Sequence, residues 1–154
     1  KDFLKDIINE IGEIKFWKLF LKPGKPFAFG YLGAESSSST PLMALPGNPV
    51  ASLVGWQLLA LPFIHAMQGR SVAALQSYPV MAGFSQRGPR GRCELLRVVL
   101  DWARELPVAQ LAGGQGSHML SAASQADGYL MINPETDVAE GSTYHYYPIN
   151  QFAA

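Results

Sequence analysis

The segment ALPGNPVAS, residues 44–52, joins a short apolar run to a longer one and has the composition of a strand-to-helix turn. Asn48 can cap a helix, and Pro49 suits the first helical position, where no N–H is needed. The free amides and the dipole of a first helical turn attract anions. We therefore expect a strand ending at Leu45, a helix beginning at Pro49 and an anion site at this junction. The alternative interpretation is an ordinary helix cap.

The residues around this turn predict an α/β arrangement. Apolar residues recur with helical spacing in residues 2–11, and Gly12 is a natural C-terminal stop. Residues 14–21, 27–32 and 42–45 are predicted strands. The helix that begins at Pro49 should continue towards Gly69, with Pro62 kinking or splitting it.

The stretch 49–67 contains no formal charge and is long enough to cross a bilayer. Five residues interrupt its apolar character: Ser52, Gly55, Gln57, Pro62 and His65. We therefore expect a helix buried inside a soluble protein, and no membrane span. The charged, amphipathic N-terminus does not resemble a secretory signal, and the single cysteine, Cys93, fits a reducing cytoplasm.

The second half of the sequence has the period of β-strands. Leu96, Val98, Leu100 and Trp102 alternate with residues of the opposite face in CELLRVVLDW, residues 93–102. Further strands are predicted at 108–112, 129–133 and 142–147, and a short helix at 118–126. The chain is accordingly divided into an α/β domain (1–69), a linker (70–78) and a small β-rich, barrel-like or sandwich domain (79–154).

The lysines are concentrated near the N-terminus, although the formal net charge is zero. Lys18, Lys22 and Lys25 lie within eight residues, beside the rigid turn KPGKP, residues 22–26. Two prolines fix the shape of the turn, so these ammonium groups have less conformational freedom to lose and could bind a phosphate or another oxyanion. The alternative is a solvated edge strand protected by lysine. The neutral total gives no case for nucleic acid.

Other motifs carry little chemistry. His65, His118 and His145 are far apart in the sequence and, with one cysteine, give no zinc spacing. GGQGSH, residues 113–118, lacks the lysine of a phosphate-binding loop.

Several of these segments together resemble the MoeA family of molybdenum cofactor synthesis, which includes the gephyrin E domain. FWKLFLKPGKPFAFG (16–30) is followed by ALPGNPV (44–50), and GRCELLR (91–97) is similar to a G-R-x-x-aromatic-x-R strand. GSHMLSAASQADGYLMINPE (116–135) is similar to the family's G-S-x-x-L-x-S-x-x-x-A-D-G segment. The resemblance spans most of residues 3–148.

The resemblance implies a partial three-layer domain of the MogA/MoaB type, followed by the β-rich domain. It also implies that the chain is the C-terminal part of a longer protein, with the catalytic acids and the magnesium ligands upstream. Molybdate would be inserted into adenylylated molybdopterin with release of AMP. The chain alone would be inactive, and a homodimer and a MogA-type adenylyltransferase are the implied protein partners.

Family analogy also assigns site residues. Molybdate or phosphate would be held by Lys18, Lys22, Lys25, Arg92, Ser117 and Ser121, and molybdopterin by Pro46, Gly47, Asn48, Pro49 and Ser52. Ala51 stands where the family usually has serine, so a hydroxyl contact at this position is not expected. Two other functions fit the sequence: a scaffolding module of the gephyrin type that presents an inter-domain groove to a peptide, and a stand-alone pterin-binding protein, which the second domain disfavours.

Overall fold

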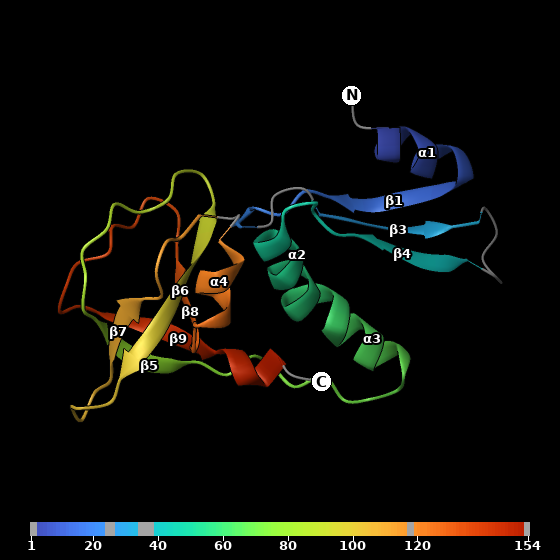
Figure 1. Ribbon diagram of the computed structural model, residues 1–154. Coiled ribbons are helices and arrows are strands. Elements are labelled where there is room, and N and C mark those ends of the chain that lie inside the picture. The colour runs from blue at the N-terminus through green and yellow to red at the C-terminus, as the bar shows by residue number, and fades with distance from the viewer. Residues whose placement is uncertain (1–2, 24–26, 34–38, 117–118, 153–154) are drawn as a thin grey trace.

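A three-stranded sheet with helices on both faces forms the N-terminal part (Figure 1). The computed structural model describes residues 3–23, 27–33, 39–116 and 119–152. Strands β1 (Gly12–Trp17), β3 (Ala28–Leu32) and β4 (Thr40–Ala44) pair in the antiparallel order β1-β3-β4. Helix α1 (Phe3–Ile11) covers one face, and Phe29 packs against Phe63, with ring centroids 5.2 Å apart, on the other. The expected helix–sheet–helix arrangement is confirmed.

The helical run after β4 begins at Pro49, as predicted. It comprises α2 (Pro49–Gly55), a π-helical segment η1 (Trp56–Ala60) and α3 (Leu61–Met67). Leu61 N donates to Trp56 O, five residues back rather than four. Pro62 follows directly and has no N–H to donate, so the disruption expected at Pro62 takes the form of a wider turn just before it.

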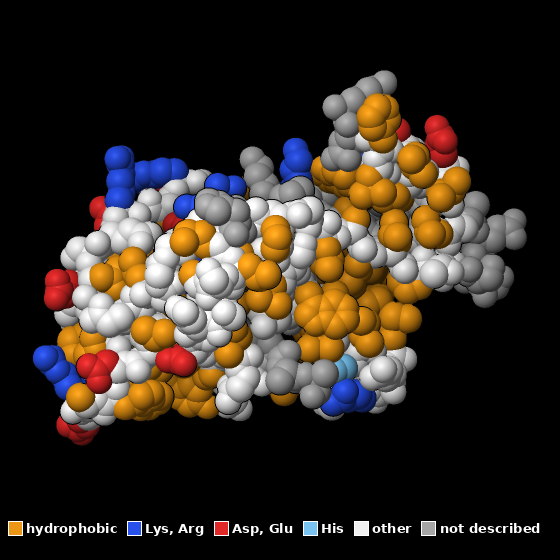
Figure 2. Space-filling model, in the orientation of Figure 1, with side chains coloured by type: hydrophobic (Ala, Val, Ile, Leu, Met, Phe, Trp, Pro, Cys, Tyr) orange, Lys and Arg blue, Asp and Glu red, His pale blue; other side chains and the backbone are white. Residues whose placement is uncertain are grey.

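This helical run is buried on one side only. By length and composition it could cross a membrane, which is weak evidence for a single helix, and 33% of its 18-residue window is buried. Val50, Val54 and Leu61 are buried, whereas Trp56 is 41% exposed. In Figure 2, hydrophobic side chains gather on the surface over α1 and over the α2–α3 run. The expected burial of the helix is thus only partly met.

The strand predicted over residues 14–21 is wrong in its extent. β1 ends at Trp17 because Lys18 adopts φ +76°, a left-handed conformation that cannot continue a strand. Lys18 N then donates to Phe27 O at 2.8 Å. The chain re-forms a two-residue strand, β2 (Leu21–Lys22), which pairs in parallel with β6 in the C-terminal half.

A closed five-stranded barrel forms the C-terminal part and confirms the barrel-like prediction. Its strands are β5 (Tyr78–Ala82), β6 (Cys93–Asp101), β7 (Val108–Leu111), β8 (Gly128–Ile132) and β9 (Thr143–Pro148). They follow the order β6-β7-β5-β9-β8, and β8 pairs back to β6. Val80, Leu96, Val98, Leu130 and Ile132, all at most 1% exposed, fill the interior.

Two details of this half differ from the sequence prediction. β5 was not expected, because Pro79 lowers the strand propensity of its segment. Trp102 was predicted to face inward with Leu96, Val98 and Leu100, but β6 ends at Asp101 and Trp102 is 72% exposed. The short predicted helix is present as α4 (Leu120–Ser124), and η2 (Ile149–Phe152) is a 3-10 turn.

An apolar cluster joins the two parts of the chain. Val54 of α2, Leu95 of β6 and Tyr129 of β8 form its buried centre, and Leu21, Leu58 and Ile149 pack around them. The cluster fixes β2, the start of β6 and α2 beside one another. Residues 70–77 contain no helix or strand. The division into two domains at this linker stays a prediction.

Candidate functional site

The predicted helix cap is formed. Asn48 has extended backbone angles, and its Oδ1 accepts a hydrogen bond from Ala51 N at 3.3 Å. Pro49 occupies the start of α2, as expected, and Ser52 N donates to Asn48 O at 2.8 Å. The side chain of Asn48 therefore accepts a hydrogen bond from one of the backbone N–H groups that have no partner within the helix at its start.

The other residues of this turn differ in accessibility. Pro46 is buried, whereas Gly47 is exposed, and no described residue lies within 4 Å of the place where its Cβ would be. The Ser52 hydroxyl donates to Pro46 O, which closes the turn. Ala51 is 4% exposed. The turn therefore presents its backbone at Gly47, and the Ser52 hydroxyl hydrogen is used within the turn.

A small pocket brings together two of the predicted anion-binding residues. Lys18, Leu19 and Phe20 line one side of a cavity of about 270 Å³, and Arg90, Gly91 and Arg92 line the other. The left-handed Lys18 ends β1, while Arg92 immediately precedes β6. Three cations thus line one concave surface, which favours an anion there. In Figure 2, Lys and Arg side chains gather along the upper edge of the molecule.

Only one of the three cations is neutralised by a partner in the part of the chain that the structure describes. Arg90 forms an ion pair with Glu135, whereas no ion pair involves Lys18 or Arg92 there. We therefore expect Lys18 and Arg92 to supply the net positive charge of the pocket. We call this cavity the Lys18–Arg92 pocket.

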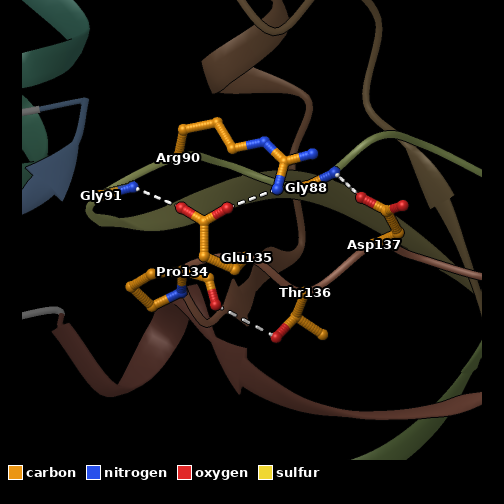
Figure 3. A network of polar contacts seen from close by, with 7 residues as sticks. All are labelled: Gly88, Arg90, Gly91, Pro134, Glu135, Thr136 and Asp137. Atoms are coloured by element: carbon orange, nitrogen blue, oxygen red, sulfur yellow. Dashed lines mark hydrogen bonds and ion pairs between the residues drawn. The ribbon is translucent and has the colours of Figure 1, made fainter.

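A clasp between two loops positions this pocket (Figure 3). Arg90 Nη1 donates to Glu135 Oε2, and Gly91 N donates to Glu135 Oε1 at 2.9 Å. Gly88 N donates to Asp137 Oδ1 at 2.8 Å. The hydrogen bond from Arg90 lowers the pKa of Glu135, and the same bond raises the pKa of Arg90. The clasp therefore holds Gly91, and Arg92 after it, in a defined position.

Lys22 follows the pocket-lining segment 18–20 in the sequence and has a carboxylate partner. Its Nζ is 2.7 Å from Glu94 Oε1, and the side chain of Glu94 is 6% exposed. The parallel pairing of β2 with β6 places the two residues opposite one another. An ammonium group has three N–H donors, so a second, anionic partner remains possible in geometry. The assignment of Lys22 to the oxyanion site stays a prediction.

The remaining predicted anion ligands are distributed differently. Lys25 and Ser117 lie outside the described residues. Ser121 is exposed on α4, and its backbone oxygen accepts a hydrogen bond from Ser124 Oγ at 2.8 Å. α4 packs against α2, the helix that Asn48 caps. None of the assigned roles is tested by this placement.

Arg97 is a candidate that sequence reasoning did not select. It is 1% exposed, and its Nη2 donates to the backbone oxygens of Gly114 at 2.8 Å and Gly116 at 3.2 Å. Its Nε and Nη1 are buried without a hydrogen-bond partner among the described residues. Desolvation lowers the pKa of Arg97. A buried cation with two unused donors is expensive, so it marks a position to which an anion could bind.

The sequence did contain a signal for Arg97. It is the last residue of the GRCELLR segment, in which only Arg92 was assigned a role. Gln115 supports the same loop, because its Oε1 accepts from Arg97 N at 2.8 Å and its Nε2 donates to Arg97 O at 3.0 Å. The loop that precedes Ser117 is thereby fixed to β6.

No magnesium site is found among these residues. The described part of the chain has no group of three or more His, Cys, Asp and Glu side chains that could hold a metal ion. These residues do not fit a magnesium centre, and no step of the chemistry is assigned to the metal here.

Two family models match the chain in succession. Residues 1–66 match the "Probable molybdopterin binding domain", and residues 80–149 match the "MoeA C-terminal region (domain IV)". The two matches correspond to the α/β part and to the barrel. The chain belongs to the MoeA family, and its homology supports a role in molybdenum cofactor biosynthesis.

Similar proteins are found among curated sequences and solved structures. The molybdopterin molybdenumtransferase of Haemophilus influenzae is 32% identical over 153 residues, covering 97% of this chain and 36% of the relative. Molybdopterin molybdenumtransferase 2 of Mycobacterium tuberculosis is 30% identical, covering 82% of this chain and 29% of the relative. The crystal structure of a molybdopterin biosynthesis MoeA protein from Pyrococcus horikosii has a TM-score of 0.71 at 24% identity, covers 96% of this chain and 35% of that chain, and supports the fold. The chain spans about a third of the length of these proteins.

Proposed function

We propose that this chain supplies the oxyanion-binding side of a site at which molybdate is inserted into adenylylated molybdopterin with release of AMP. The observation that carries the proposal is the Lys18–Arg92 pocket, in which residues from the two halves of the chain meet. The names of the homologous transferases support the reaction class. The oxyanion would be held by charge-assisted hydrogen bonds from Lys18 and Arg92.

Each group in this proposal has a separate part. Arg92 supplies a planar fork that fits two oxygens of one anion, whereas Lys18 supplies a point charge. The start of α2, with exposed Gly47, would receive the phosphate or pterin portion at its backbone amides. Arg92 and Lys18, held in place around the bound molybdate, lower the free-energy cost of bringing the anionic molybdopterin substrate next to it. The chain's own residues thus bind and orient, and no proton-transferring group is assigned among them.

We propose further that the isolated chain does not catalyse the reaction. We also propose that the protein acts in the cytoplasm. The relatives are about three times as long, and we expect the catalytic acids to lie in the part of these proteins that the chain does not cover. Incubating the chain with adenylylated molybdopterin, molybdate and magnesium should release AMP only at the background rate. Sustained AMP release by the chain alone would contradict this part of the proposal.

The binding role is tested by titrating molybdate into the chain while amide chemical shifts are followed. Lys18→Ala and Arg92→Ala should each weaken binding about tenfold or more, since losing a charge-assisted hydrogen bond costs about 1.5–3 kcal/mol. Lys15→Ala is the matched control, because Lys15 pairs with Glu13 on β1 and does not line the pocket. Equal affinities in all four proteins, with the fold intact, would remove the pocket from the site.

A further inference from the structure

The barrel has an open mouth at the end remote from the Lys18–Arg92 pocket. A cavity of about 910 Å³ lies there. All five barrel strands, or the residues adjoining them, contribute to its wall at this end: Tyr78 of β5, Leu100 of β6, Pro107 before β7, Asp127 before β8 and Tyr146 of β9. Arg92 adjoins the first residue of β6 and Trp102 the last, so the length of the strand, about 26 Å at roughly 3.3 Å per residue, separates the two cavities.

The wall of this cavity is mainly apolar and carries two exposed aromatic rings. Leu100, Leu106 and Pro107 form part of it. Trp102 is 72% exposed and Tyr78 is 50% exposed, and both line the cavity. Aromatic side chains offer a large apolar contact surface. The rings therefore favour a ligand that has an apolar body.

The charged groups of the cavity are negative. Asp127 and Glu105 line it, and among the described residues no Lys, Arg or His does so. Asp127 Oδ2 accepts from Leu100 N at 2.8 Å, which leaves Oδ1 without a hydrogen bond in the described part of the chain. Tyr146 is 5% exposed, and its hydroxyl has no hydrogen-bond partner among the described residues. The Tyr146 hydroxyl and the Asp127 carboxylate are thus both available to accept from an N–H donor.

We propose that the barrel mouth binds a small organic cation, namely a protonated amine or a guanidinium carried on an aromatic or aliphatic body. The ammonium or guanidinium N–H groups donate to Asp127 and to the Tyr146 hydroxyl, with Glu105 adding negative charge. The apolar body packs against Trp102 and Tyr78. Few polar groups in an apolar wall, and a volume within the usual range of about 300–1,000 Å³, are typical of small-molecule sites.

This inference is independent of the proposed oxyanion site. The two cavities lie at opposite ends of the barrel and prefer ligands of opposite charge. Failure of molybdate to bind at the Lys18–Arg92 pocket would not contradict the proposed cation site at the barrel mouth. Failure of a cation to bind at the barrel mouth would likewise not contradict the proposed oxyanion site.

The test uses three probes of similar size that differ in charge: phenethylammonium, phenethyl alcohol and 3-phenylpropionate. Each is titrated into the chain, and the shifts of amides around residues 100–107 and 126–128 are followed. Phenethylammonium should bind about tenfold more tightly than the alcohol, because it gains charge-assisted hydrogen bonds, and 3-phenylpropionate should bind most weakly. Absence of shifts with phenethylammonium, or equal affinities for the three probes, would overturn the proposal.

Variants locate the contacts. Asp127→Asn keeps an oxygen for the Leu100 amide, and Tyr146→Phe removes only the hydroxyl, so both should fold. Each should lower phenethylammonium affinity severalfold and that for phenethyl alcohol by a smaller factor, while Trp102→Ala should lower both affinities to a similar extent. Glu140→Gln, which removes an exposed carboxylate that does not line the cavity, is the matched control.

An unaltered phenethylammonium affinity in Asp127→Asn and Tyr146→Phe would contradict the assignment. The acetylated and amidated peptide Gly-Lys-Gly provides the last arm of the test. Tighter binding of this peptide than of phenethylammonium would identify a protein side chain as the occupant and overturn the assignment to a small molecule.

Discussion

Arg97 and Tyr129 are register partners on β6 and β8, and they are buried together at 1% and 2% exposure. Arg97 reaches the loop at Gly114 and Gly116. The Tyr129 hydroxyl donates to Gln57 Oε1 at 2.8 Å. The pair therefore links the loop before Ser117 on one side with the α2–α3 run on the other. Because each residue has a different partner, substitutions can separate the two links.

Replacing Arg97 by methionine should increase the mobility of the loop at residues 114–116 while changing the free energy of unfolding of the whole protein only slightly. The substitution removes the hydrogen bonds to Gly114 and Gly116, but it also removes a buried charge with two unused donors. The relief of this buried charge offsets the loss of the two hydrogen bonds, so the free energy of unfolding should change by about 1 kcal/mol or less. Hydrogen exchange should accelerate at Gln115 and its neighbours. A loss of more than about 3 kcal/mol would indicate that the charge itself stabilises the fold.

Burial of Tyr129 should make the protein less stable at high pH. Burial raises its pKa to about 12, so the folded state retains the phenol proton after the unfolded chain, whose tyrosine titrates at about 10, has released it. The associated stability is fully present below about pH 10 and is lost as the pH rises towards 12. Burial also raises the pKa of Tyr146 to about 12, which makes Tyr146→Phe a comparison variant.

Urea unfolding at pH 7, 10 and 11 measures this effect. The wild type should lose stability from pH 10 to pH 11, and Tyr129→Phe should lose less over the same interval. At pH 7, Tyr129→Phe should cost about 1 kcal/mol because it removes the hydrogen bond to Gln57. Parallel pH profiles for Tyr129→Phe and the wild type would show that the phenol does not titrate as expected.

The ion pair between Lys22 and Glu94 should be visible in a double-mutant cycle. Lys22→Met leaves a carboxylate, 6% exposed, without its cation, and should cost about 1–3 kcal/mol. The estimate lies below that for a fully buried pair because the Lys22 side chain is 48% exposed. Glu94→Gln should reduce the penalty of Lys22→Met when the two are combined. Strict additivity of the two substitutions would mean that the groups do not interact.

Protonation of Glu135 should open the clasp beside Arg92. The hydrogen bond from Arg90 lowers the pKa of Glu135 below its ordinary value of 4.5. The contribution of the clasp is therefore fully present above about pH 4.5 and is lost as the pH falls through the lowered pKa. The carboxyl carbon shift of Glu135, followed by NMR, should titrate below pH 4.5 in the wild type and nearer to it in Arg90→Ala. An unchanged midpoint in Arg90→Ala would rule out Arg90 as the cause.

Local sequence signals were sufficient for the junction around Asn48 and for most of the strands. The cap, the proline at the first helical position and the apolar run determine the start of α2 without help from distant residues. Likewise, the period of two places Leu96 and Val98 in the barrel interior. These predictions succeeded because each depends on residues that are near one another in the sequence.

The candidate site was less predictable because distant segments assemble it. Periodicity assigned Arg97 to the outer face of the barrel but could not show that the loop at Gly114 covers that face. Nor could it show that Lys22 would meet Glu94, since a two-residue strand has no recognisable pattern. The Lys18–Arg92 pocket likewise depends on a left-handed residue, Lys18, in a segment that was predicted to remain extended.

The parallel pairing of β2 with β6 has a consequence for gene recombination between related proteins. Residues 21–22 belong to the first half of the chain, yet they complete an edge of the second half at residues 93–94. A chimera that exchanges only the segment after the linker would pair a foreign β6 with the host's Leu21 and Lys22. It would exchange Glu94 for the foreign residue while keeping the host's Lys22, the cation with which Glu94 pairs. Exchanges that carry residues 18–23 together with the barrel should therefore yield soluble hybrids more often than exchanges of the barrel alone.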